Sequence, residues 1–386
     1  MTARQTLRVH SVFLLLKTNR RFIRMKRFFG VLVMILVGLG LWQDVHAQGE
    51  ATALFLIINP GARQGGMGEA GVALPNDANA VYWNPAGLAF QYENPEADHK
   101  GEVTFMHVQW LPQFNLNDLY YDFGAIRYSM PGIGTFGMGI QFINYGENIN
   151  TDNSGNELGR FNSNEVAVTG SYALKVKPNL GIGVNLKYIY SNLSPDVYVS
   201  NERRQGRGSS IAVDLGVLYY PGFAKKLSIG ANISNIGPRI TYVDRDQQDP
   251  LPTNLRLGVA YRLVDSEFNK LTLVYDVNRL LVRRYDDGTS DPVFKAMFLT
   301  TWTDGTFKDQ LRRFTHSIGM EYWYTDLIAL RMGYFYEDDK YGGRRFWTFG
   351  GGIRYSIIGV DFSYIYASIQ DHPLSDTMRF SLLVDF

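Results

Sequence analysis

The sequence predicts an all-β protein, a transmembrane antiparallel β-barrel of about 14 strands that carries a small N-terminal plug. Much of the chain after residue 101 consists of segments of about ten residues with apolar side chains at every second position. A tilted strand that crosses a membrane needs roughly 9 to 11 residues, whereas strands of soluble proteins usually have about 5 or 6. Aromatic residues make up 14% of the chain, and the connections between segments alternate between long and short. A soluble β-sandwich also alternates, but these three observations together favour the barrel.

Residues 1–47 have the pattern of a secretory signal peptide. Met25 is followed by two basic residues and then by an apolar run from Phe28 to Trp42. Val45–Ala47 comes next and resembles the A-x-A pattern of small residues at which a signal peptide is cleaved. The apolar run has 15 residues, which is short of the roughly 20 that a membrane-spanning helix needs. Translation can start at the first residue or at Met25, and we expect the mature chain to begin near Gln48.

The charge of the mature chain argues against nucleic acid as a partner. Residues 1–47 hold eight of the 38 basic residues and one of the 37 acidic residues, so removing them leaves 30 bases and 36 acids. A net charge of about −6 is unlike the basic surface of a nucleic-acid-binding protein. The chain has no cysteine, so it has neither disulfides nor the lipid-modified cysteine of a lipoprotein.

Residues 48–100 are expected to form the plug. Between Asn59 and Phe90 the sequence is rich in glycine, has two Asn-Pro pairs and ends in a compact apolar stretch, so it reads neither as a strand nor as a hairpin loop. Glycine supplies backbone freedom and proline fixes φ, as an irregular folded segment requires. The apolar side chains need a covered surface, and no second core is available. We therefore expect this segment to fill the periplasmic half of the barrel lumen.

One part of the plug has the spacing of a dinucleotide-binding fingerprint. Gly66, Gly68 and Gly71 match the three glycines of that motif. The motif needs a helix that opens at the third glycine, but Pro75 follows after four residues and no βαβ pattern continues. The glycines are therefore interpreted as a structural turn.

Residues 101–386 are expected to form the barrel. Its clearest strand alternates Leu180, Ile182 and Val184 with Gly181 and Gly183, which places one face toward lipid and the other toward the lumen. The predicted strands are 102–111, 119–129, 133–145, 161–174, 179–192, 209–220, 227–236, 254–263, 269–278, 313–323, 327–336, 344–355, 360–367 and 378–386. The longest connections are 146–160, 193–208, 237–253 and 279–312, and long connections of such barrels are extracellular.

The connection 279–312 is predicted to be structured, since unstructured loops of this length are uncommon. Phe307–Arg312 has a short helical pattern, and the stretch from Pro292 to Trp302 is apolar. Two alternatives are open for this connection: it caps the barrel, or it contributes two further strands and raises the strand number to sixteen.

The last strand alternates apolar and polar residues and ends on Phe386. This arrangement resembles the closing strand that the outer-membrane assembly machinery recognises, so Phe386 is expected to act as a C-terminal assembly signal. Closure also leaves no sheet edge exposed to lipid. Together with the signal peptide, this predicts the outer membrane of a Gram-negative bacterium.

The segments 59–69, 83–86, 235–240 and 251–258 carry a family resemblance. They resemble the PorV/PorQ family, outer-membrane barrels of the FadL-like superfamily, and are most similar to its PorV branch from the type IX secretion system. The plug residues that carry it, or lie within the same segment, are Asn59, Arg63, Gly66, Gly68, Asp77, Trp83, Asn84 and Pro85. The resemblance implies a barrel of fourteen strands with an N-terminal plug.

The resemblance also implies a function and a set of partners. A PorV-like protein binds the C-terminal signal domain of cargo proteins, takes them from the type IX translocon barrel and presents them to the sortase PorU and other attachment-complex proteins at the cell surface. The expected partners are therefore these proteins and outer-membrane lipid. Cargo contacts are expected in the long extracellular loops, at Arg203, Arg204, Arg207, Tyr242, Arg245, Arg283, Arg284 and Tyr285.

The sequence does not predict an enzyme. Only four histidines follow residue 47, and His316 and Ser317 are adjacent in a strand, so their side chains point to opposite faces. No histidine cluster has metal-ligand spacing, so no catalytic residue, metal site or cofactor is expected. The alternative function is that of a FadL-like transporter of hydrophobic small molecules, because the inward positions also include apolar residues.

Overall fold

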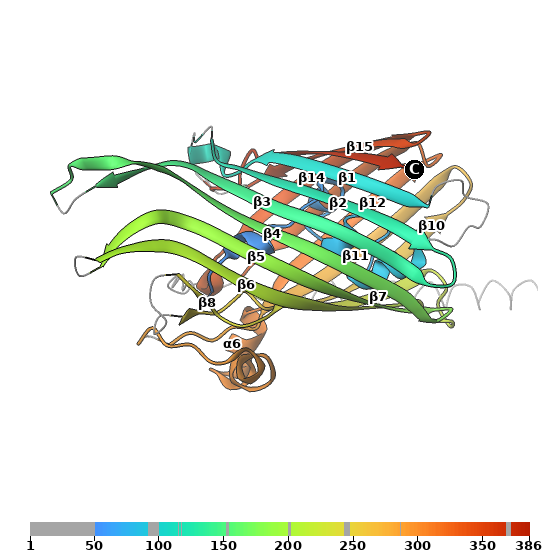
Figure 1. Cartoon of the computed structure of the whole chain (residues 1–386). Helices are drawn as coiled ribbons and strands as arrows, with labels where there is room; N and C mark the ends of the chain where they lie inside the picture. The colour runs from blue at the N-terminus through green and yellow to red at the C-terminus, as the bar shows by residue number, and fades with distance from the viewer. Residues whose placement is uncertain are drawn as a thin grey trace, which may run out of the picture. The chain divides into compact units, whose positions relative to one another are not determined.

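The computed structural model describes residues 51–91, 100–114, 116, 118–151, 154–199, 202–242, 248–285, 287–367 and 372–386, without the side chains of 195–199 and 202–205. The predicted signal peptide, residues 1–47, lies outside these residues. In the described part of the chain, fourteen antiparallel strands form a closed barrel in which neighbours in sequence are neighbours in space (Figure 1). The barrel closes where the first strand pairs with the last.

The barrel strands are β1 (Gly101–Gln109), β2 (Tyr120–Met130), β3 (Gly134–Thr151), β4 (Glu157–Lys177), β5 (Leu180–Val199), β6 (Glu202–Tyr219), β7 (Leu227–Ile236), β10 (Asn254–Asp265), β11 (Asn269–Leu280), β12 (Thr315–Tyr324), β13 (Ile328–Tyr336), β14 (Arg345–Tyr355), β15 (Ile358–Tyr366) and β16 (Met378–Asp385). Each of them overlaps one predicted strand, so the predicted fold class and strand number are confirmed. The short strands β8 (Ile240–Thr241) and β9 (Gln248–Asp249) form a separate two-stranded hairpin.

Two predicted loops, 146–160 and 193–208, are mostly strand, so these predictions are wrong. The pairing of β3 with β4 continues to Thr151 and Glu157, and the pairing of β5 with β6 continues to Val199 and Glu202. These outer parts are polar in sequence and lack the apolar alternation that marks a membrane strand. Backbone pairing between two adjacent strands does not require that alternation, which is why the pattern ended before the strands did.

The described residues of the connection between β11 and β12 form no barrel strand and the barrel closes with fourteen strands, so the sixteen-strand alternative is wrong. It forms α4 (Val293–Lys295), the π-helical turn η4 (Ala296–Thr300), α5 (Thr301–Thr303) and α6 (Phe307–Arg312). The predicted helix at 307–312 is confirmed. Thr306 and Asp309 form a reciprocal capping box at its start, which explains why the helix begins there. No helix among the described residues is long and apolar enough to cross a membrane.

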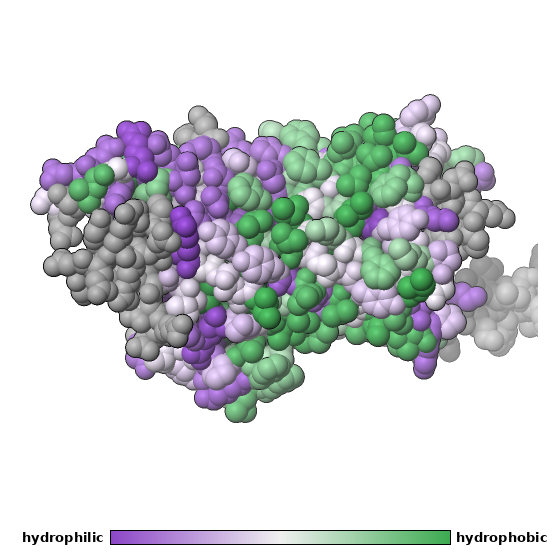
Figure 2. Space-filling view, viewed as in Figure 1, coloured by the Kyte–Doolittle hydropathy of each residue, from purple (hydrophilic) through white to green (hydrophobic). Residues whose placement is uncertain are grey.

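The outward face of the barrel is apolar. Outward side chains near the middle of the strands are widely exposed, for example Leu186 at 63% and Leu330 at 60%, and Figure 2 shows hydrophobic residues gathered over the barrel wall. Such a belt faces lipid in an outer-membrane barrel. The short turns and the C-terminus lie at one end and the long connections at the other, which makes the latter the extracellular end.

Residues 51–91 form four short helical pieces that pack against the inner wall. These are η1 (Leu54–Ile57), α2 (Ala62–Gly65), α3 (Ala80–Trp83) and η2 (Pro85–Phe90), drawn in blue inside the barrel in Figure 1. Phe55, Trp83 and Leu88 are at most 1% exposed and share one hydrophobic core with inward residues of the strands. We refer to residues 51–91 as the plug.

Candidate functional site: the plug and the extracellular end

A chain of buried ion pairs fixes the plug to the barrel wall. The guanidinium of Arg63 donates to both oxygens of Glu321 on β12, at 2.7 Å each, and to Asp77 at 3.0 Å. Glu321 also accepts from Arg331, which in turn pairs with Asp361, both at 2.7 Å. All five side chains are buried, so each charge depends on its partners for compensation.

The electrostatics of Arg63 follow from this arrangement. Burial by itself lowers the pKa of Arg63, and the carboxylates of Glu321 and Asp77 more than offset that effect, so the pKa lies above its usual value. The guanidinium is therefore permanently charged at the contact between the plug and the barrel wall. Its bidentate contact with Glu321 also fixes the orientation of α2, because the planar fork matches a carboxylate in one geometry.

A second set of contacts fixes the plug to two further strands, β10 and β16. Asn59 donates to Glu69 at 2.8 Å and accepts from Arg256 of β10 at 2.8 Å, and Glu69 pairs with Arg379 of β16 at 2.6 Å. Arg256 also lies over the rings of Tyr82 and Trp83, 4.7 and 4.8 Å from their centroids. The plug is thereby attached to strands on several sides of the lumen.

The glycines of the plug signature lie where the backbone of the plug closely approaches the backbone of the barrel strands. Gly68 has φ +70° and its N–H donates to Thr348 at 2.7 Å, and a Cβ added at Gly66 would lie 3.0 Å from the Cα of Gly350. Pro85 packs against Gly183 and Gly216 of the wall. The segment from Gly66 to Gly71 is thus a structural turn that packs closely against the barrel wall, in agreement with its interpretation from the sequence.

The remaining signature residues hold the plug together internally. The Asn84 side chain donates to the carbonyls of Val72 and Val217 and caps η2 through the Ala86 N–H. The Trp83 indole N–H donates to the carbonyl of Pro60 at 3.0 Å. All eight signature residues therefore contact the plug itself or the inner wall. The partners Glu321, Arg331 and Arg379 were absent from the predicted site, although charged residues at inward strand positions were a visible signal.

At the extracellular end, the connection between β7 and β10 folds back onto the plug. Leu251 is buried in the core shared with the plug, and Ile240 of the same connection is fully buried. The Thr52 N–H donates to Pro250, and the hydroxyls of Thr52 and Tyr242 lie 3.0 Å apart. Tyr242, a predicted cargo contact, therefore also links this connection to the plug. Arg245 lies outside the described residues.

Three further predicted contacts tie the extracellular connections to one another. Arg283 pairs with Asp304 at 2.7 Å, Arg284 pairs with Asp249 at 3.2 Å, and the Tyr285 hydroxyl donates to Asp291 at 2.8 Å. The connection 281–314 is thereby joined to the connection 237–253. The three side chains predicted to contact cargo therefore form ion pairs or hydrogen bonds within the protein.

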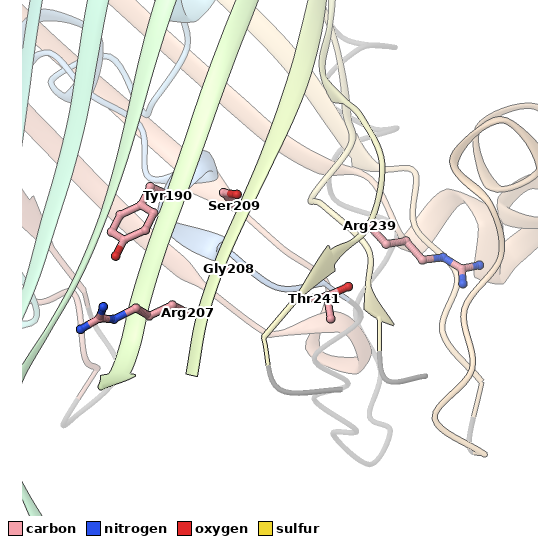
Figure 3. A pocket seen from close by; sticks show the side chains of 6 residues that line it. All are labelled: Tyr190, Arg207, Gly208, Ser209, Arg239 and Thr241. Carbon is pink, nitrogen blue, oxygen red and sulfur yellow. The ribbon is translucent and has the colours of Figure 1, made fainter. Parts of the chain in front are cut away.

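The predicted arginines of β6 lie at the extracellular rim. The side chains of Arg203 and Arg204 lie outside the described part. Arg207 donates to Asn192 at 2.9 Å and borders a pocket of about 300 Å³. The other lining residues are Tyr190, Gly208, Ser209, Arg239 and Thr241. Figure 3 shows the guanidinium groups of Arg207 and Arg239 pointing away from each other, so the two cations do not converge on one ligand.

Phe386 closes the seam of the barrel. It exchanges backbone hydrogen bonds of 2.8 and 3.0 Å with Gly101, and a Cβ added at Gly101 would lie 2.4 Å from the Phe386 ring. Among the described residues no group of three or more histidines and acidic residues is arranged to hold a metal ion.

Arg279 fastens the helices of the connection 281–314 to the outside of the barrel. Its guanidinium lies 4.1 Å from the ring centroid of Trp302 and 5.1 Å from that of Phe314, and it donates to the Thr301 carbonyl and the Gln310 side chain. Asp309 of α6 pairs with Lys340 at 2.9 Å, and the Thr306 hydroxyl and this lysine hold the pKa of Asp309 below its usual range. The helices are therefore held from two sides.

We expect Arg279→Ala to loosen these helices without unfolding the barrel. Hydrogen bonds to a charged group contribute about 1.5 to 3 kcal/mol, so a loss of about 2.7 kcal/mol would make the open state roughly 100-fold more populated. Cleavage of the connection by chymotrypsin should rise by a similar factor, since cleavage follows that population. Arg262→Ala, which removes a half-exposed arginine, is the matched control. Equal cleavage of the two variants would contradict the anchoring role.

Comparison with known proteins gives one family and a set of similar folds. The family model described as type IX secretion system protein PorV matches residues 43–287. Among solved structures, the CymD monoaromatic hydrocarbon channel has 14% identity and a TM-score of 0.50, with 85% of this chain and 98% of that chain covered. A TodX monoaromatic hydrocarbon channel mutant has 12% identity and a TM-score of 0.50, with the same coverage. The Pseudomonas putida toluene transporter TodX has 12% identity and a TM-score of 0.49, with 89% and 98% covered. At these identities the likeness to the first two structures shows the fold alone, and none of the curated proteins matches.

Proposed function

The chain belongs to the PorV family of type IX secretion system proteins, and we propose that it acts as a cargo carrier in the outer membrane. In this role it binds the C-terminal signal domain of cargo, takes the cargo from the translocon barrel and presents it to the sortase PorU and its attachment complex. We assign residues 1–47 to a cleaved signal peptide, 48–100 to the plug and 101–386 to the barrel. The role is binding without chemistry, in line with the non-enzymatic secretion barrels of this family.

The distribution of surface between the two ends of the barrel is the observation that supports cargo binding at the extracellular end. A stable protein interface takes roughly 800 Å² from each partner. The turns at the other end are as short as 178–179 and 356–357, which is too little for such an area. The outer parts of the β3–β4 and β5–β6 hairpins, with the connections 237–253 and 281–314, supply it.

The filled lumen favours this role over that of a FadL-like transporter of hydrophobic small molecules. Such transport needs a path that a ligand can open, whereas the pairs Arg63–Glu321 and Glu69–Arg379 form charged contacts across the junction of plug and wall. Moving the plug would separate buried charges, each of which costs several kcal/mol when left unpaired. The transporter remains the second candidate on the likeness of fold.

The structure changes how the cargo surface is best tested. Removing 239–249 would delete Ile240, which is fully buried, and removing 281–288 would delete Leu281 and Val282, which are both 2% exposed. Shortening the β5–β6 hairpin avoids this, because Ser194 and Gly206 face each other across it and can be joined directly. Arg207→Glu is a second, milder change at the same rim.

Both variants are expected to weaken binding of a purified cargo signal domain at least ~10-fold, a loss of about 1.4 kcal/mol. In cells, cargo should accumulate in the periplasm while the barrel stays heat-modifiable on gels. Lys225→Glu, at an exposed turn of the opposite end, is the matched control and should bind cargo normally. Normal cargo display by both variants would exclude this surface. A purified barrel that takes up hydrophobic small molecules but no cargo domain would favour the transporter instead.

A further inference from the structure

The helices between β11 and β12 expose an unusual amount of apolar surface. Phe294, Phe298 and Leu299 are 63%, 69% and 54% exposed, and Phe307 and Leu311 of α6 are 78% and 53% exposed. Single exposed apolar residues are ordinary, but five of them on the helical segments of one connection mark an interaction surface. We call these five side chains the apolar foot.

The apolar foot lies on the outside of the barrel, as the direction of Arg279 shows. On β11, Asp276 points into the lumen, where it accepts from the N–H groups of Gly71 and Val72. Side chains alternate along a strand, so Tyr275, Val277 and Arg279 point outward. Arg279 is nevertheless 2% exposed, because the helices of the connection cover it. The helices therefore pack on the outer surface of the wall.

The foot also lies at the extracellular edge of the lipid-facing belt. Leu273 and Tyr275 are 37% and 38% exposed on the outward face, and Arg279 comes only four residues after Tyr275, roughly 13 Å along the strand. In Figure 2 hydrophobic and hydrophilic residues lie together at the position that α6 has in Figure 1, and the hydrophobic ones lie next to the belt on the wall. The foot is thus continuous with a surface that already contacts lipid.

We propose that the apolar foot inserts into the outer leaflet of the membrane, at the boundary between acyl chains and headgroups. An interfacial element of this kind combines buried aromatic and aliphatic side chains with cations that reach the headgroups. Lys308 follows Phe307 and is exposed, so its ammonium can extend toward lipid phosphates. The segment is held against the barrel by Arg279 and by the Asp309–Lys340 pair, which presents the foot to the membrane at a fixed height.

The proposal depends on location in the outer membrane and not on cargo binding, so either can fail without the other. The chain has no cysteine, which permits single-cysteine variants of the full protein. Phe298→Cys and Phe307→Cys carry a nitroxide label, and the protein is reconstituted in vesicles of phosphatidylethanolamine and phosphatidylglycerol. Collision of the label with oxygen, which concentrates in lipid, is compared with collision with a water-soluble nickel complex.

Two positions calibrate this measurement. Leu330→Cys reports the lipid belt, and Asp287→Cys reports an exposed polar position of the same connection. We expect the oxygen-to-nickel ratio at 298 and 307 to shift away from the value at 287 and toward the value at 330. Ratios equal to that at 287 would overturn the proposal. Labels that are open to nickel in vesicles but protected in native outer membrane would also overturn it, and would identify a protein partner as the occupant.

Discussion

Replacing Arg63 by alanine is expected to release the plug from the barrel wall. Among the described residues, only the Arg63 guanidinium pairs with both Asp77 of the plug and Glu321 of the wall. Breaking a buried ion pair by removing one partner typically costs about 3 to 5 kcal/mol, because the remaining charges lose their compensation. The equilibrium between docked and released plug should therefore shift roughly 10²- to 10⁴-fold, since about 1.4 kcal/mol corresponds to tenfold.

The shift can be measured with a cysteine in place of Ala80, which is fully buried in α3. In the Arg63→Ala background, a water-soluble maleimide should label this cysteine faster by a similar factor, while the barrel stays heat-modifiable. Arg160→Ala is the matched control, since Arg160 also pairs with two carboxylates but is about half exposed. Exposed pairs are screened by water, so labelling in that background should not change. Slow labelling in the Arg63→Ala protein would mean that packing alone holds the plug.

The barrel was predictable from sequence because lipid imposes a simple rule on each strand. Every outward side chain between headgroups is apolar, so Leu180, Ile182 and Val184 mark β5 without any knowledge of its neighbours. Strand residues beyond the membrane are not in contact with lipid, so their outward side chains need not be apolar. The outer parts of β3 to β6 were therefore taken for loops, although their backbones pair as strands.

The candidate site was only half predictable, for a different reason. Arg63 and Asp77 lie close in sequence within the plug, whereas Glu321 lies 258 residues away from Arg63. The closure of the barrel and the depth of the plug decide which inward carboxylate contacts the plug. Neither of them produces a recognisable pattern in the local sequence. The helices at 293–312 were partly predictable, because the capping box of α6 is local, but the position of Arg279 beneath them depends on tertiary packing.

Gly333→Ala is expected to have a second large effect, because the wall leaves no room for a side chain there. Gly333 on β13 and Gly319 on β12 face each other across the sheet and both point at the plug. A Cβ at Gly333 would lie 2.0 Å from the Gly68 nitrogen, and one at Gly319 would lie 2.3 Å from the Met67 oxygen. These neighbours are backbone atoms, which cannot rotate away. Overpacking usually costs about 1 to 3 kcal/mol, and we expect the upper end of this range.

The double variant tests whether both glycines serve the same contact. Labelling of a cysteine at position 80 should rise roughly 100-fold in Gly333→Ala, and adding Gly319→Ala should have little further effect, because a plug already displaced no longer meets the second methyl group. Gly170→Ala is the control, since the only atom near its added Cβ is the Leu186 carbonyl oxygen at 4.0 Å. Independent, additive effects of the two glycines would show that each substitution disturbs its own strand. The close approach of the plug backbone would then not be the reason for glycine at these positions.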